Sequence, residues 1–224
     1  MRKDRNLRTL HAFAVGHADK LKFTSYSEDI DMIRNAREGD LPEILAIYAP
    51  YIENTTYSFE YTVPTLAEFT ARFREITQQF PWLVWEEDGK VLGYAYGSLP
   101  FIRAAYAWCG EVSIYLSPEI QGLGIGRKLY AALEKAMELQ GYRVLLSLIT
   151  AENEGSLAFH RAMGYRVVGH FPDCGMKFNR WLGVTWMQKE LNSVGIPSDP
   201  PRPWRTFVES DRNLANILDK MSIS

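Results

Sequence analysis

The residues with the clearest chemical potential are three alternate glycines in the run QGLGIGRKLY, at Gly122, Gly124 and Gly126. They lie between an apolar segment typical of a strand and an amphipathic segment typical of a helix. Glycine lets the backbone turn tightly, and its amide N–H can approach a ligand without a Cβ in the way. Amides at a helix start also carry the positive end of the helix dipole. The pattern therefore predicts a cradle for a diphosphate, with Arg127 just inside the helix as a phosphate partner.

Two well-known nucleotide-binding loops fit this run poorly. A dinucleotide-binding loop has the spacing GxGxxG, whereas the spacing here is GxGxG and the preceding strand lies far from the N-terminus. A P-loop requires GxxxxGK followed by Ser or Thr, and no such pair follows these glycines. Two alternatives remain, a glycine-rich turn without a ligand and a diphosphate site of another type.

Helices and strands must position this loop, and those before it can be predicted from periodicity. Capping boxes at Asp40 with Glu43 and at Thr65 with Glu68 predict two helix starts. Apolar stripes with helical spacing follow them, at Leu41, Ile44, Leu45, Tyr48 and Ile52, and at Leu66, Phe69, Phe73, Ile76 and Phe80. The dipeptide Asp88-Gly89 predicts a hairpin between WLVWEE and VLGYAYGSL. We also expect a strand before these helices, in MIRNAR, and a further strand over residues 108–116.

After the loop, the segments predict a strand–helix–strand unit and two further strands. A helix carries Ile125, Leu129, Leu133 and Met137 on one face, and VLLSLIT is typical of a strand buried on both sides. Asn153 is a helix cap, Gly164 a left-handed helix end, and strands are expected over residues 165–169 and 185–191. The order β, α, α, β, β, β, α, β, α, β, β predicts an α/β fold with a mixed sheet.

Composition limits the class of protein. The 224 residues have a net charge of −2 and 46% hydrophobic residues, which indicates one compact domain without a global attraction for nucleic acid or membrane. No apolar run approaches the roughly 20 residues that cross a bilayer, and no signal-peptide h-region is present. The two cysteines have no metal-ligand spacing, so we expect no metal and a cytoplasmic location. We divide the chain into an arm (1–31), a domain (32–191) and a Pro-rich extension (192–224) with a short helix near 213–220.

The run QGLGIGR resembles the Q/R-x-x-G-x-G/A motif of the GNAT superfamily of N-acetyltransferases, at Gln121, Gly124 and Gly126. Five further segments resemble the phosphinothricin and methionine sulfoximine acetyltransferases: YIENTTYSFE, FPWLVWEEDGKVLGYAYG, RAAYAW with EVSIYL, NEGSLAFHRAMGYRVVG and GMKFNRWLGVTWMQKEL. The resemblance covers about residues 32–190. It implies a mixed, mostly antiparallel sheet with helices on both faces, and acetyl-CoA as co-substrate with its pyrophosphate in the glycine loop.

The resemblance also implies the residues that bind this co-substrate. The strand before the loop would pair with the pantetheine arm, and an N–H near Tyr115 or Leu116 would stabilise the oxyanion. Asn153 and Ser156 match positions that contact the coenzyme, and ordinary helix capping is the alternative. The full set is Ile114, Tyr115, Leu116, Gln121, Gly122, Leu123, Gly124, Ile125, Gly126, Arg127, Asn153 and Ser156.

Glu111 matches a glutamate proposed as general base in the resembling enzymes. A carboxylate on this apolar strand would be partly desolvated, which raises its pKa toward a useful range. The alternative is a glutamate that faces solvent or an arginine. His160 matches a histidine that would protonate the leaving thiolate or contact substrate, or it is structural.

The resemblance places the acceptor near Arg103 and Tyr106, with Glu53 and Tyr57 lining the same cavity. A guanidinium binds carboxylate or phosphinate oxygens in a fork, which favours an acidic amino acid or its analogue. One departure, Gly183 where the family usually has Asp, puts the named acceptor in doubt. Polyamines, aminoglycosides and protein N-termini are the rival acceptors, and a CoA-binding regulator without catalysis is the rival of another class. Relatives are often homodimers, which we expect here too.

Overall fold

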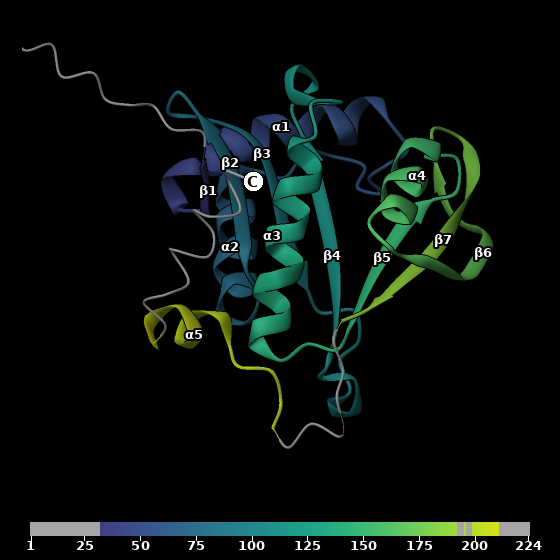
Figure 1. The fold of residues 1–224 in the computed structure, drawn as a ribbon. Coiled ribbons are helices and arrows are strands. Elements are labelled where there is room, and N and C mark those ends of the chain that lie inside the picture. The colour runs from purple at the N-terminus through teal and green to yellow at the C-terminus, as the bar shows by residue number, and fades with distance from the viewer. Residues whose placement is uncertain (1–31, 192–194, 196–198, 211–224) are drawn as a thin grey trace, which may run out of the picture.

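The computed structural model describes residues 32–191, 195 and 199–210, so the arm expected over residues 1–31 lies outside its description. A seven-stranded sheet has the order β1-β2-β3-β4-β5-β7-β6 (Figure 1). All neighbouring strands are antiparallel except β4 and β5, which run parallel. The predicted mixed, mostly antiparallel sheet is therefore confirmed. The strands are β1 Met32–Asn35, β2 Trp82–Glu87, β3 Lys90–Ser98, β4 Cys109–Leu116, β5 Val144–Thr150, β6 Arg166–Lys177 and β7 Arg180–Glu190.

Helices cover both faces of the sheet. The helices are α1 Leu41–Asn54, α2 Leu66–Gln79, α3 Ile125–Gln140, α4 Glu154–Ala162 and α5 Trp204–Ser210. The stripes of α1 and α2 pack on β2 and β3 around Trp82 and Tyr94. On the other face, α3 buries Leu129, Leu133 and Met137 in a larger core. No helix in the described residues is long and apolar enough to cross a membrane.

The parallel strands β4 and β5 pair only at one end. Their register contains Cys109 with Val144, Gly110 with Leu145 and Glu111 with Leu146. Beyond these three pairs the strands diverge, as Figure 1 shows between their labels. The sheet thus consists of a β1–β4 half and a β5–β7 half joined at the base of a wedge.

Local signals predicted most helix and strand ends correctly. The Thr65 side chain accepts from the Glu68 N–H while Glu68 accepts from the Thr65 N–H, which confirms that capping box. Asp88 and Gly89 have φ angles of 51° and 73°, as the predicted hairpin turn requires. The Asn153 side chain accepts from the Ser156 N–H, and Gly164 has a φ of 91°.

The capping box expected at Asp40 and Glu43 was wrong. Asp40 makes no side-chain cap for α1, because its carboxylate binds the Arg37 N–H and the Arg34 guanidinium. Glu43 accepts instead from the Val91 N–H at 2.6 Å, which ties α1 to β3. The Asp40 carboxylate thus binds groups just upstream of it, and Glu43 binds a partner 48 positions away.

The last two strands are longer than predicted. They form one hairpin from Arg166 to Glu190, turning at Phe178 and Asn179, which have φ angles of 51° and 58°. Register shifts after Val167 and Phe171 bend β6, and Pro172 lies in the second of these. These irregularities break the period-two pattern from which a strand is predicted.

The C-terminal extension packs on the domain through α5. Trp204 and Phe207 are buried in the larger core, and the Arg202 N–H donates to Gln140 O at 2.9 Å. The indole N–H of Trp108 donates to Asp199 O at 3.0 Å. The helix predicted near residues 213–220 lies outside the described residues, and α5 was not predicted.

Candidate active site

A cavity of about 480 Å³ fills the open end of the wedge between β4 and β5. The α3 and α4 side contributes Ser147, Phe159 and His160, whereas Ser113, Leu148 and Thr150 come from the other face of the sheet. The cavity therefore passes through the sheet. It brings together nine of the residues selected from the sequence: Tyr57, Ile114, Tyr115, Leu116, Gln121, Gly122, Asn153, Ser156 and His160.

The glycine loop begins at the end of β4 and enters α3 at the rim of this cavity. Gly122 and Gly124 have φ angles of 80° and 83°, which favour glycine. A Cβ at Gly126 would lie 2.9 Å from Leu116 Cδ1, so glycine there lets α3 pack closely on β4. Within the described residues, the N–H groups of residues 122–126 have no backbone acceptor. A row of free donors at a helix start fits an anionic ligand such as a diphosphate.

The free edge of β4 provides further backbone donors. The Ser117 N–H donates to Leu92 O on β3 at 2.7 Å. Since N–H directions alternate along a strand, the amides of Ile114 and Leu116 face the wedge, and that of Tyr115 faces β3. The Tyr115 side chain packs against Tyr48 and Tyr51, with ring centroids 4.8 and 5.1 Å away. Of the two donors expected from the sequence, only Leu116 therefore faces the cavity, and Ile114 joins it.

Tyr51 on α1 occupies the Leu116 end of this edge. Its hydroxyl donates to Leu116 O at 2.7 Å and lies 3.4 Å from the Leu116 N. The Gln121 side-chain amide donates to the same hydroxyl at 3.1 Å. Ile114 is thus the residue in the middle of the cavity whose amide has no partner in the described residues.

Glu111 lies one residue before the cavity lining begins at Val112. Its carboxylate has no hydrogen-bond or ion-pair partner among the described residues, and burial raises the pKa of Glu111. Of the two alternatives weighed from the sequence, no arginine pairs with Glu111 in the described residues, and the side chain is only partly exposed to solvent. A desolvated carboxylate without a partner is suited to accept a proton.

His160 is buried and fully engaged in hydrogen bonds. Its Nδ1 donates to Ser156 O at 2.8 Å, so Nε2 accepts from the Tyr130 and Ser147 hydroxyls, each at 2.8 Å. Burial lowers the pKa of His160, which favours the neutral imidazole. The histidine thus has no spare N–H for the cavity and orients Ser147 in the cavity wall.

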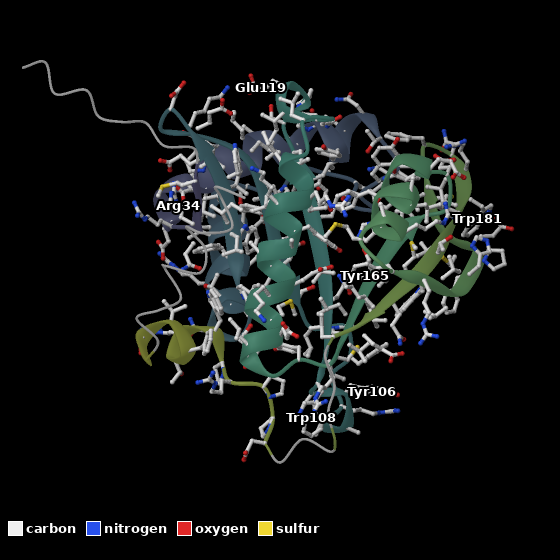
Figure 2. All side chains as sticks on the ribbon, in the orientation of Figure 1. Arg34, Tyr106, Trp108, Glu119, Tyr165 and Trp181 are labelled. Atoms are coloured by element: carbon white, nitrogen blue, oxygen red, sulfur yellow. The ribbon has the colours of Figure 1, made fainter. Side chains whose placement is uncertain are left out.

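The remaining predicted residues do not share the cavity. Glu53 is exposed near the end of α1, and Arg103 and Tyr106 lie on the exposed loop before β4. Figure 2 shows Tyr106 near Trp108, at the end of the molecule opposite Glu119 and the glycine loop. The Tyr106 ring packs on Phe101 at 4.6 Å, and Phe101 stacks on Trp186 at 5.9 Å. The loop therefore contacts β7, and it leads into β4 at Cys109, two residues before Glu111.

Several cavity residues were not selected from the sequence. Ser147 had a signal, because it is the single polar residue within the apolar run VLLSLI of a buried strand. Tyr51 had none, since it lies on an amphipathic helix where an aromatic residue is most often part of the core. Within the described residues, no group of three or more His, Cys, Asp or Glu could hold a metal ion.

Comparison with known proteins gives matches over the whole of this domain. Residues 33–186 match the model of the acetyltransferase (GNAT) domain family. The phosphinothricin N-acetyltransferase of Alcaligenes faecalis is 38% identical over 72% of this chain and 83% of its own length. The L-methionine sulfoximine/L-methionine sulfone acetyltransferase of Pseudomonas paraeruginosa is 38% identical over 71% of this chain and 94% of its own. A crystal structure of a Sinorhizobium meliloti phosphinothricin acetyltransferase in complex with AcCoA matches with a TM-score of 0.71 and 37% identity, covering 76% and 92% of the two chains.

Proposed function

The chain belongs to the GNAT family of N-acetyltransferases, and on this premise we propose that it transfers the acetyl group of acetyl-CoA to the amine of a small amino-acid analogue. The observation that carries the proposal is the unpartnered, partly buried Glu111 at the base of a cavity whose rim is a row of free amides. We infer the class of acceptor from the relatives whose names give phosphinothricin and methionine sulfoximine as substrates.

We propose that acetyl-CoA enters the wedge from the glycine loop. The amides of residues 122–126 would hold its pyrophosphate, with Gln121 and Arg127 beside them. The pantetheine arm would lie along the free edge of β4, with Asn153 and Ser156 of α4 on the other side. Its thioester would then lie near Ile114, whose N–H has no partner in the described residues.

The acceptor would approach from the Glu111 end of β4, along the loop that carries Arg103 and Tyr106. The Arg103 guanidinium suits a carboxylate or phosphinate, and Glu53 and Tyr57 would line the route from the α1 side. Glu111 accepts a proton from the acceptor ammonium, directly or through water. The free amine then attacks the thioester carbon, and the Ile114 N–H donates to the oxygen as it becomes an oxyanion. The intermediate collapses with loss of CoA as a thiolate, which takes up the proton that the nitrogen loses as the amide forms. His160 contributes by holding Ser147 in the cavity wall.

Thiol release from acetyl-CoA tests this proposal. The acceptor panel should contain phosphinothricin, methionine sulfoximine, methionine sulfone, spermidine, an aminoglycoside and a peptide N-terminus. We expect turnover with the amino-acid analogues and a loss of about 10²–10⁴-fold in Glu111→Gln. Glu75→Gln is the matched control, because Glu75 is an exposed glutamate on α2.

Each rival has its own result in this assay. Turnover only with spermidine, the aminoglycoside or the peptide would replace the acceptor class but retain the enzyme. Binding of acetyl-CoA without thiol release from any amine would indicate a regulator. Full activity of Glu111→Gln at neutral pH would reject Glu111 as the base.

We also infer a homodimer in the cytoplasm. An aromatic row is formed by Phe171 on β6, Trp186 on β7 and Phe101 on the loop before β4, with the Phe171 and Trp186 centroids 5.7 Å apart. Phe171 is 51% exposed. A second copy would cover this apolar face. Light scattering after gel filtration should give a dimer, and Phe171→Arg should give a monomer.

Cys109 and Cys174 are both free thiols, which suits the reducing conditions of the cytoplasm.

A further inference from the structure

The width of the cleft needs a physical cause beyond the sheet itself. Three residue pairs join β4 and β5 at the base of the wedge, and no strand pairing continues past Glu111 and Leu146 in the described residues. Two sheet halves hinged at one end could open or close at the other. Contacts across the open end must therefore fix the distance between the walls of the cavity.

Residues 55–61, which follow α1, provide such contacts, and we call them the strap. The strap leaves the β1–β4 half at the end of α1 and reaches the β5–β7 half. The Thr150 hydroxyl at the end of β5 donates to Thr56 O at 2.7 Å. The Thr56 hydroxyl in turn donates to the Glu152 carboxylate, in the turn after β5, at 2.6 Å.

Lys177, at the end of β6, makes the most buried contact with this region. It is 2% exposed, and its Nζ donates to Ile52 O and to Ser58 O, each at 2.6 Å. Ile52 O is among the last carbonyls of α1, where the helix dipole favours a cation. One ammonium group therefore joins α1, the strap and the β6–β7 hairpin.

The residues next to Lys177 on β6 also hold the strap close to this strand. A Cβ on Gly175 would lie 2.2 Å from the Phe59 ring, so only glycine lets the strap approach β6 this closely. The Tyr61 hydroxyl donates to Met176 O. Three consecutive residues of β6 thus contact the strap.

We propose that the strap, held by Lys177, is a tie across the open end of the wedge, and that Lys177 is a positioning residue that sets the width of the acetyl-CoA cleft. The strap controls cavity walls directly, because Tyr57 lies within it and Thr150 is bonded to it, and both line the cavity. Tyr51, which holds Leu116 at the edge of β4, lies one residue before Ile52. The assignment of the ligand rests on the proposed function, whereas the tie itself does not.

A distance measurement tests the tie without any ligand. Spin labels are placed at Glu119, after β4, and at Arg161 on α4, in a chain with Cys109→Ser and Cys174→Ser. We expect a narrow distance distribution in this background and a broader or shifted one after Lys177→Met. Lys189→Met is the matched control, since Lys189 also bridges two elements, to Glu134 at 2.6 Å, but not through the strap. Equal distributions in Lys177→Met and in the unsubstituted background would overturn the proposal.

Calorimetric titration with acetyl-CoA tests the consequence for the site. We expect Lys177→Met to weaken acetyl-CoA binding about tenfold, which is the order of magnitude of one lost charged hydrogen bond. In steady-state kinetics, KM should change more than kcat. Lys189→Met should bind as tightly as wild type below its unfolding temperature, and Lys177→Arg should restore part of the affinity. Equal affinities in the two Met variants would contradict the positioning function. If wild type bound no acetyl-CoA, the proposed function would fail, and the label distances would still decide on the tie.

A milder variant covers the case in which Lys177→Met does not fold. Thr56→Val keeps the volume of a buried side chain and removes only its hydroxyl bond to Glu152. We expect the same broadening of the label distances to a smaller extent. An unchanged distance distribution in Thr56→Val would contradict the proposal that the strap ties the two halves of the sheet.

Discussion

Replacing Phe207 by alanine tests whether the C-terminal extension is part of the domain core. Phe207 is 1% exposed, lies on α5 and belongs to the same core as Phe80 and Tyr142. Its ring packs in a tilted arrangement with its centroid 5.7 Å from that of Trp204, and it lies 4.4 Å beneath the Arg202 guanidinium. A Phe→Ala change at such a site costs about 3–5 kcal/mol, from lost burial and the cavity left behind.

This loss is large relative to the stability of a domain, about 5–15 kcal/mol. At about 2–4 °C per kcal/mol for a chain of this length, the unfolding temperature should fall by roughly 6–20 °C. Urea unfolding followed by circular dichroism measures the change in free energy directly. The midpoint should fall with little change in slope.

Arg205 on the exposed face of α5 supplies the control. Its guanidinium contacts Gln78 at 3.4 Å and Glu209 at 3.5 Å, both at the surface. Arg205→Ala should therefore change stability by no more than about 0.5 kcal/mol. If Phe207→Ala were equally mild, α5 would not be part of the core, and the packing argument for the extension would be wrong.

Three further predictions concern the site and its supports. Glu111→Gln should raise the free energy of unfolding at neutral pH, because the folded-state pKa of Glu111 is raised and its ionised form opposes folding. This gain should disappear in acid, below the ordinary pKa of glutamate, and equal gains at both pH values in thermal melts would refute the assignment. Gly124→Ala should cost about 1–2 kcal/mol, because its φ is 83°, whereas Gly39→Ala, with nothing within 4 Å of the new Cβ, should be nearly neutral in the same denaturation assay. Thr65→Ala should cost about 1 kcal/mol through loss of the cap on α2, and an unchanged urea midpoint would contradict it.

The sequence predicted those parts of the fold that depend on neighbouring residues. The Thr65 cap, the Asp88-Gly89 turn and the stripe of α3 need only residues a few positions apart. The glycine loop was also local, since its φ angles and its place before a helix follow from one short run. The mixed sheet followed from the order of these elements.

The missed features depend on residues far apart in the chain. Glu43 on α1 binds the Val91 N–H on β3, 48 positions away, and not the start of its own helix. Tyr51 and Leu116 are 65 positions apart, and Lys177 and Ile52 are 125 apart, so no local pattern connects them. The hairpin of β6 and β7 was shortened in the prediction because bulges disguise its alternation. Only tertiary packing specifies such pairs.

The divergence of β4 from β5 leaves an unusual edge, because it lies at the centre of the sheet and not at its margin. Backbone amides in a central strand normally exchange with solvent only through global unfolding. The Ile114 amide has no strand partner on this side, so it should exchange with deuterium far faster than those of Ser113 and Tyr115, which face β3. One fast-exchanging amide between two slow ones within a buried strand would follow, and an extended molecule that filled the edge would abolish this difference.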